Sequence, residues 1–321
     1  GPELETLKRV IPVKAGIYLN RFPIKSGMTV ELFLKGRHAI YEALRGLGIG
    51  QGDEVIVQAF TCIAVVQPIL DLGATPIYVD VSPKNLNPSL TQIKKCVSPK
   101  TKAVILQHTL GYINRENDKI VDWCHDHKIS VIQDLAHAFG ADFKPFNLFN
   151  HFNHFLNSDA IILSFSQDKV IDGISGGGLV IARSSEIDEE RRGNLDSITD
   201  RHDRQGGLAM TGIIKLLLYP ILTYLIRSTY KYKIGKLIHF CAKNLNLLPS
   251  PLEAPSKPTK LPNALATIAL NQLNRLEQII THRQNIALVY DRIINKKLKL
   301  ITSGDIKNGS CLRYPLWVEN R

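Results

Sequence analysis

The sequence contains few cysteines, and they are not arranged as a structural framework. Five cysteines occur in 321 residues, an odd number, and none belongs to a C-x-x-C motif. Disulfide-rich secreted domains and zinc ribbons need such spacings, so both classes are excluded. No secretory signal is visible, and Gly1-Pro2 is typical of a protease-cleavage scar. We therefore expect a cytoplasmic protein in a reducing compartment.

The chain also lacks an apolar run long enough to cross a bilayer. Its most apolar stretch, residues 213–226, has fourteen residues and contains Pro220, whereas a spanning helix needs about twenty apolar residues. Basic residues follow at once, namely Arg227, Lys231, Lys233 and Lys236. The insertion at residues 208–248 therefore has two interpretations. It is either a hairpin buried against the sheet or a partner subunit, or an element lying peripherally on the inner face of the membrane.

Recognisable nucleic-acid and metal-binding spacings are missing as well. A formal net charge of +11 suits anionic partners such as nucleotide phosphates, acidic lipid headgroups or nucleic acid. The basic residues form no zinc-finger or aromatic-basic reading element, so we expect no nucleic-acid partner. His125 and His127 stand two residues apart on a predicted helix, where they do not face each other, so we expect no metal.

What the chain does have is a regular alternation of apolar runs and amphipathic segments. With 321 residues and 44% hydrophobic content it can bury a large core and build a smaller second domain. The pattern predicts strands at 54–57, 76–81, 103–107 and 129–132, and helices at 32–47, 89–97 and 117–127. This order predicts an α/β fold with a mostly parallel sheet between layers of helices.

The chemistry is expected in residues 161–182, which are predicted to form a strand, a polar loop and a second strand. Lys169 lies in this loop, after Ser164 and Ser166 and before three glycines at 176–178 that would let a ligand approach closely. A lysine in a dry cleft can lose its proton and attack a carbonyl, which is the chemistry of pyridoxal phosphate enzymes. A solvated loop lysine is the ordinary alternative.

An aspartate about thirty-five residues earlier favours the cofactor interpretation. Asp134 follows the buried strand predicted at 129–132, at the carboxyl end where open α/β sheets bind ligands. A carboxylate there can pair with a pyridinium nitrogen and keep the ring protonated, so that the ring acts as an electron sink. Asp134 and Lys169 are therefore the two candidate catalytic residues.

The same residues resemble the DegT/StrS family of sugar aminotransferases. Asp134 with His137 three residues on, then S-F-x-x-x-K and a glycine run, carry the resemblance. It extends upstream through G-R-H-A-I-Y-E-A-L, F-T-C, G-A-T-P-I-Y-V-D-V and H-T-L-G, and downstream into L-A-T-I-A-L-N-Q-L-N-R-L-E. The resemblance implies the fold type I architecture of aspartate aminotransferase, pyridoxal 5'-phosphate as cofactor, and a nucleotide-linked keto sugar as substrate beside an amino-acid donor.

The resemblance also implies a role for each matching residue. Lys169 would hold the cofactor covalently and shuttle a proton, Asp134 would keep the ring nitrogen protonated, and His137 would pack against the ring or touch its hydroxyl. The phosphate contacts would come from Ser164, Gly36, Arg37 and His38. A satisfied core histidine and an ordinary helix start are the alternatives for His137 and for the glycine-arginine-histidine segment.

The chain departs from the family at two places near the expected cofactor. Cys62 stands where relatives often carry an aromatic ring that stacks on the pyridine ring. Residues 258–261 replace the family's N-Y-R-M, so the asparagine offered to the neighbouring subunit is lost and Lys260 is the cross-subunit candidate that remains. The resemblance implies a homodimer whose sites lie at the subunit boundary.

The expected division of the chain is an N-terminal arm (1–29), a cofactor-binding large domain (30–255) and a small C-terminal α+β domain (256–321). The small domain is predicted to begin with one long helix, 264–295, to include a strand at 312–318, and to be incomplete relative to the family. The expected function is amino-sugar formation for cell-surface polysaccharide or related biosynthesis. Two alternatives stay open: an inert homologue acting as a binding or regulatory subunit, and an aminotransferase for a lipid-linked, membrane-associated sugar.

Overall fold

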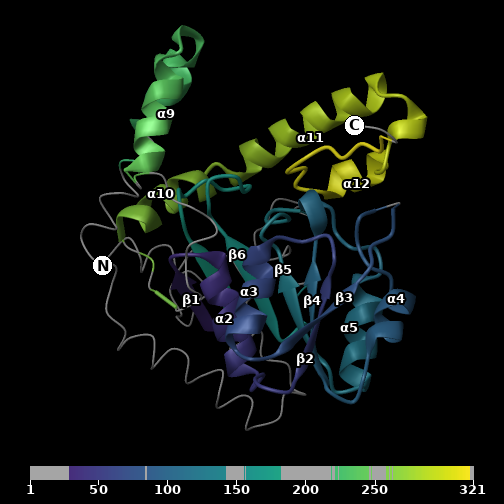
Figure 1. Cartoon of the computed structure of the whole chain (residues 1–321). Coiled ribbons are helices and arrows are strands. Elements are labelled where there is room, and N and C mark those ends of the chain that lie inside the picture. Colours follow the sequence, from purple (N-terminus) through teal and green to yellow (C-terminus); the bar gives the residue numbers. More distant parts are fainter. Residues whose placement is uncertain are drawn as a thin grey trace, which may run out of the picture.

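A seven-stranded sheet forms the centre of the protein, in the order β1-β7-β6-β5-β4-β2-β3 (Figure 1). The structure is a computed structural model that describes residues 29–83, 85–141, 155, 157–181, 218, 221–222, 224–245, 247, 258–259, 261 and 263–318. The strands are β1 (Thr29–Phe33), β2 (Glu54–Gln58), β3 (Thr75–Val79), β4 (Thr101–Gln107), β5 (Ser130–Asp134), β6 (Ala160–Ser164) and β7 (Gly177–Ile181). Strands β3, β2, β4, β5 and β6 pair in parallel, and β7 runs antiparallel to both β6 and β1. The predicted mostly parallel sheet is confirmed.

Helices cover both faces of this sheet, which explains why its central strands are apolar throughout. The covering helices are α2 (Gly36–Gly46), α3 (Ile63–Asp71), α4 (Leu90–Cys96), α5 (Asn117–Asp126) and α10 (Asn263–Leu273). Ile105 and Ile162 bury against α2 and α3 on one face, whereas Val104 and Val131 bury against α4 and α5 on the other. Successive side chains of a strand point to opposite faces, so a strand covered on both sides needs a continuous apolar run.

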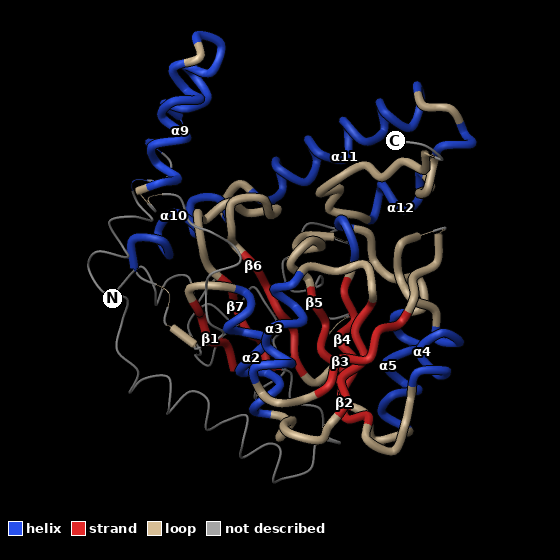
Figure 2. Tube along the Cα trace, in the orientation of Figure 1, coloured by secondary structure: helices blue, strands red, loops and turns tan. Residues whose placement is uncertain are grey.

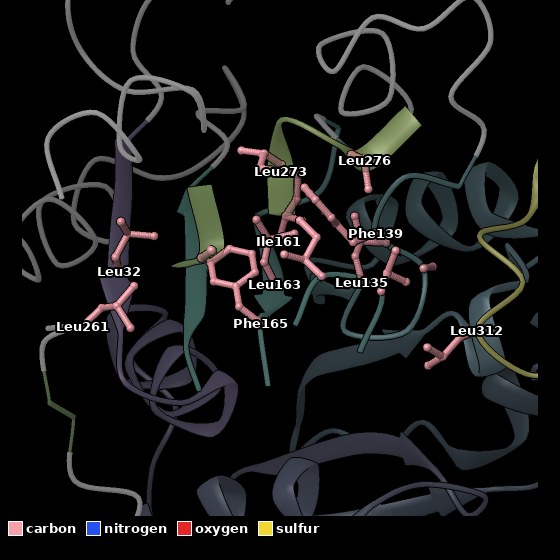
Figure 3. Close-up of a cluster of buried hydrophobic side chains, with 14 of the residues drawn as sticks. Leu32, Leu135, Phe139, Ile161, Leu163, Phe165, Leu261, Leu273, Leu276 and Leu312 are labelled. Carbon is pink, nitrogen blue, oxygen red and sulfur yellow. The ribbon is translucent and has the colours of Figure 1, made fainter. Parts of the chain in front are cut away.

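The C-terminal part corrects two of the predicted elements. The long helix expected at 264–295 is broken at Asn274 and Arg275 into α10 and α11 (Leu276–Ile293), which Figure 2 shows as separate helices. The break lets Leu273 and Leu276 enter the same buried cluster on the sheet (Figure 3). The strand expected at 312–318 is wrong, because only an isolated bridge joins Leu316 to Lys299. The last elements before this segment are η4 (Lys296–Leu298) and α12 (Ser303–Asn308).

Part of the insertion forms a helical hairpin that leaves the body of the protein. Residues 224–229 are helical and lead through η3 (Tyr230–Tyr232) into α9 (Ile234–Asn244), which extends away from the sheet in Figure 1. Within the described residues, no helix is both long and apolar enough to cross a bilayer. The arm at 1–28 and the domain boundary at 255–256 lie outside the described residues, so this division of the chain stays a prediction.

Candidate active site

The loop that carries Lys169 is closed by its own backbone hydrogen bonds and pinned by apolar side chains. Phe165 N–H donates to Gly176 O (2.8 Å), and Gly173 N–H donates to Phe165 O (2.8 Å). Val170 and Ile171 are buried in a core cluster. The same cluster holds Phe165 and Leu273 of α10, which Figure 3 labels. The sequence predicted a polar loop, but these side chains fix it to the sheet. The Lys169 side chain is consequently only 14% exposed, and its Nζ lies 3.8 Å from Asp168 Oδ2.

Asp134 ends β5 and is 2% exposed. Its Oδ1 accepts a hydrogen bond from Ala136 N–H (2.9 Å). Burial raises the pKa of the Asp134 carboxyl, while the Ala136 N–H and the Lys169 ammonium act in the opposite direction. A buried carboxylate of this kind is stabilised when a bound group brings a positive charge to it, as a pyridinium N–H would.

His137 lies beside both of these groups. Its Nδ1 accepts a hydrogen bond from Leu110 N–H (3.3 Å), which places the ring proton on Nε2. The pKa of His137 is lowered to about 4, chiefly by burial and also by Lys169 and Arg313, while Asp168 acts in the opposite direction. His137 is therefore neutral at pH 7, and its Nε2 and ring faces remain for contact with a ligand.

The amino end of α2 meets the end of β6 in a tight backbone contact. A Cβ on Gly36 would lie 3.4 Å from the Ser164 Cβ, and one on Gly177 would lie 2.5 Å from the Gly36 Cα. Only glycine fits at 177, and this brings the start of the helix against Ser164, whose Oγ is 3.0 Å from Ser166 Oγ. Burial and the nearby Arg37 guanidinium lower the pKa of Lys35. Crowded cations and hydroxyls at a helix N-terminus favour a phosphate.

Arg37 and His38 are both buried in the first turn of α2. Cys62 is exposed at the N-cap of α3, next to Thr61, whose Oγ1 donates to Gln107 Oε1 (2.5 Å). Gln107 is the cross-strand neighbour of Asp134, so the Cys62 segment adjoins the aspartate end of the site. Lys260 lies outside the described residues, and its role stays a prediction.

A buried histidine that the sequence did not single out braces this edge of the sheet. His108 follows β4; its Nδ1 accepts from Asn114 N–H (3.0 Å) and its Nε2–H donates to Gln133 Oε1 (2.8 Å). Gln133 in turn donates to Asn117 Oδ1 (2.9 Å). The pKa of His108 is lowered to about 4 because the effect of burial outweighs the hydrogen bond to Gln133, which acts in the opposite direction. The only signal in the sequence was the H-T-L-G motif that contains this histidine.

Two arginines from the C-terminal part also reach this region. The Nη1 atoms of Arg283 and Arg313 both donate to Leu312 O, at 3.4 and 3.1 Å. Arg313 N–H donates to Leu110 O (3.3 Å), the residue whose own N–H binds His137. Burial and the Arg313 charge lower the pKa of Arg283. Among the described residues neither guanidinium forms an ion pair, so together they suit an anion.

A separate cavity and the two histidines weighed as metal ligands lie away from this cluster. A cavity of about 490 Å³ between residues 113–118 and α12 is lined by Asn114 and Asn117, not by Lys169. His125 Nε2 is 3.3 Å from Asp159 Oδ2, and His127 Nδ1–H donates to Trp123 O (2.8 Å), so the two histidines have separate partners. No group of three or more metal-ligating side chains occurs within the described part of the chain.

The sheet, its helices and this cluster at the carboxyl edge define the fold type I architecture of pyridoxal phosphate-dependent aminotransferases. Residues 33–210 match the model of the DegT/DnrJ/EryC1/StrS aminotransferase family. The chain belongs to this family, as the resemblance in its motifs implied.

Named relatives fall within the same family. The chain is 34% identical over 158 residues to UDP-N-acetyl-3-dehydro-alpha-D-glucosamine 3-aminotransferase of Acidithiobacillus ferrooxidans, covering 49% of this chain and 41% of the relative. It is 28% identical over 267 residues to GDP-perosamine synthase of Escherichia coli O157:H7, covering 83% and 58%. The chain thus spans about half the length of these relatives.

The structure of NtdA from Bacillus subtilis, solved with bound cofactor PMP, superposes with a TM-score of 0.66 at 19% identity. The match covers 98% of this chain and 58% of that one. At this identity the likeness establishes the fold, while the site rests on the residues described above.

Proposed function

We propose that the protein is a pyridoxal phosphate-dependent aminotransferase that converts a nucleotide-linked keto sugar into an amino sugar, for cell-surface polysaccharide or a related product. The observation that carries the proposal is the meeting of Lys169, Asp134 and His137 at the carboxyl edge of the sheet. When bound there, the cofactor supplies an electron sink that weakens the Cα–H bond of an attached amino acid.

The residues of the site divide the remaining work among them. Lys169 Nζ is the point of covalent attachment and, once released, the base that takes the substrate proton and returns it. The Asp134 carboxylate holds the proton on the ring nitrogen, since its Oδ1 is already oriented by Ala136. The neutral His137 positions the ring. Ser164 and the start of α2 hold the phosphate.

Arg283 and Arg313 supply a cationic site for the anionic part of a substrate. The two guanidinium groups share Leu312 O, and the Arg313 backbone N–H donates to Leu110 O, the residue whose own N–H binds His137, so an anion bound there lies close to the site. A donor carboxylate and a sugar-nucleotide phosphate both match a guanidinium pair.

A nucleotide-linked keto sugar is supported by the names of the relatives, one of which acts on a UDP-sugar while the other is a GDP-perosamine synthase. Because the two relatives differ in nucleotide, they favour the sugar class rather than a particular nucleotide.

A homodimer in the cytoplasm is the second part of the proposal. Phe60 and Ile63 flank Cys62 and are 51% and 43% exposed, which is unusual for apolar side chains beside a functional site. A second subunit that covers them would complete the site next to Cys62. Five free cysteines in the structure suit a reducing compartment. Sedimentation of the parent and of Phe60→Asp tests the dimer, which the variant should dissociate.

Borohydride reduction followed by peptide mass spectrometry tests the activity proposal. The reconstituted protein should show an absorption band at about 400 nm that reduction removes, with the cofactor mass on the Lys169 peptide. Lys169→Ala should lose the band, the label and turnover, while Lys102→Ala, an exposed lysine of β4, should keep all three. A cofactor that never attaches to the parent would instead support the inert binding or regulatory homologue.

A further inference from the structure

The described residues of the hairpin, 218, 221–222 and 224–245, expose many large apolar side chains. Ten of the twenty-two large apolar side chains that are exposed among the described residues lie here: Leu218, Ile221, Tyr224, Leu225, Tyr230, Tyr232, Ile234, Leu237, Phe240 and Leu245. Leu237 is 63% exposed and Phe240 is 62% exposed. Large apolar side chains exposed together in one segment are typical of surfaces that bind a partner or a membrane.

Helix α9 has three distinct sides. Gly235 and Ala242, two turns apart, are buried, and a Cβ on Gly235 would collide with Ile226 O, so this side packs against the preceding helix. Leu237 and Phe240 lie on the exposed apolar side together with Ile234. Lys236 and Lys243 lie two turns apart from each other, between the buried side and the exposed apolar side. An apolar arc bordered by lysines is the arrangement of helices that lie in a membrane interface.

The charge of the segment is of one sign. No aspartate or glutamate occurs between Asp203 and Glu253, a stretch that contains seven lysines and arginines. The five of these cations that the structure describes are all exposed: Arg227, Lys231, Lys233, Lys236 and Lys243. Three exposed tyrosines at 224, 230 and 232 add amphipathic rings of the kind that settle at headgroup level.

We infer that the described residues of this hairpin, 218, 221–222 and 224–245, form a docking surface for an anionic membrane. The apolar side of α9 enters the boundary between headgroups and acyl chains, and the nearby cations contact acidic headgroups. A membrane therefore accounts for both the exposed apolar side chains and the positive charge of the hairpin. A second copy of the chain fits less well, because a symmetric contact through this face would oppose five cations to the same five. The enzyme would thereby work at the membrane surface rather than in bulk solution.

Vesicle sedimentation of the full chain tests this inference. The parent should pellet with phosphatidylcholine vesicles that contain phosphatidylserine, and weakly or not at all with phosphatidylcholine alone. Lys236→Gln with Lys243→Gln should weaken binding by about twentyfold, and Leu237→Asp with Phe240→Asp by roughly a hundredfold or more. Because all four side chains are exposed, the variants should keep the parent's melting temperature.

Matched controls carry the same changes outside the hairpin. Val289→Asp with Ile293→Asp alters two exposed apolar side chains of α11, and Lys296→Gln with Lys297→Gln removes two exposed lysines of η4. Both should bind vesicles as the parent does. The inference is overturned if the parent does not bind anionic vesicles, or if the variant with Leu237→Asp and Phe240→Asp binds them as the parent does. Loss of a solution oligomer by the aspartate pair, without vesicle binding by the parent, would assign the face to a second copy.

Discussion

The Lys169 loop and the α9 hairpin are built from similar residues but treat their apolar side chains in opposite ways. In the loop, Val170 and Ile171 turn inward, and the lysine between Asp168 and Val170 is held at the edge of the core. In the hairpin, Leu237 and Phe240 turn outward and the lysines lie beside them. Local composition alone does not distinguish the two.

What separates them is the surface against which each segment packs. The loop lies between β6 and α10, where backbone hydrogen bonds close it on itself and a Cβ on Gly173 would lie only 3.1 Å from the Ala269 Cβ. The two helices of the hairpin pack on each other at Gly235, and Leu237 and Phe240 on the outward side of α9 remain exposed. Helix α9 extends away from the sheet (Figure 1). A site that fixes a reactive amine needs the first arrangement, and a surface that recognises a membrane needs the second.

The largest effect is expected from Asp134→Asn, which changes charge at the rigid site without changing shape. The amide cannot stabilise a pyridinium, so turnover should fall by orders of magnitude while cofactor absorbance persists. Asp168→Asn, at the exposed carboxylate beside Lys169, is the matched control and should stay within a few-fold of the parent.

The same variant has a signature that needs no cofactor. Because burial raises the pKa of Asp134 above its unfolded value, the ionised carboxylate destabilises the cofactor-free protein as pH rises through the folded pKa. Asp134→Asn should therefore melt higher than the parent at pH 7 and approach it at acidic pH. If Asp134→Asn and the parent melted alike at both pH values and the variant kept its activity, Asp134 would have no role in catalysis beyond ending the strand.

The contrast between the two segments can be tested with one substitution in each. Ile171→Asp places a carboxylate in the core and should cost about 3–5 kcal/mol of unfolding free energy. Leu237→Asp should change it by about 0.5 kcal/mol or less, because that side chain already faces solvent. Urea unfolding measures both. A large loss of unfolding free energy in Leu237→Asp would show that the hairpin is covered in solution. The contrast between a buried loop and an exposed hairpin would then be wrong.

Much of the sheet could be predicted because buried strands read as continuous apolar runs; β4 and β5 were placed within two residues of their observed ends. Lys169 and Asp134 were found because each follows such a run. The inward turn of Ile171 was missed, since periodicity in a short loop does not show which neighbour covers it. Arg313 was missed for a related reason, because it meets Leu110 only after the chain has folded across two hundred residues.

A smaller effect concerns acid stability at the bracing histidine. His108 binds a proton near pH 6.5 when unfolded but only at about 4 in the native state, so the unfolded chain takes up more protons between these values. Stability should fall by about 3 kcal/mol as pH drops through this window. His108→Gln should flatten that part of the curve, leaving the contribution of His137. His127→Gln changes an exposed histidine and should leave the dependence of stability on pH as in the parent. If His108→Gln also left that dependence unchanged, another group would be responsible for it.

The smallest effect is expected at Arg313, where the C-terminal part reaches the site. Loss of one charge-assisted hydrogen bond costs roughly 1.5–3 kcal/mol, so Arg313→Gln should raise KM for the anionic substrate by about tenfold or more with kcat little changed. Arg292→Gln, on the exposed side of α11, is the matched control and should leave KM alone. If the Arg313 side chain served only to hold Leu312 in place through its bond to Leu312 O, its variant would melt lower while KM stayed constant. That result would confine substrate recognition to the sheet edge. A raised KM at an unchanged melting temperature would extend recognition to the C-terminal part of the chain.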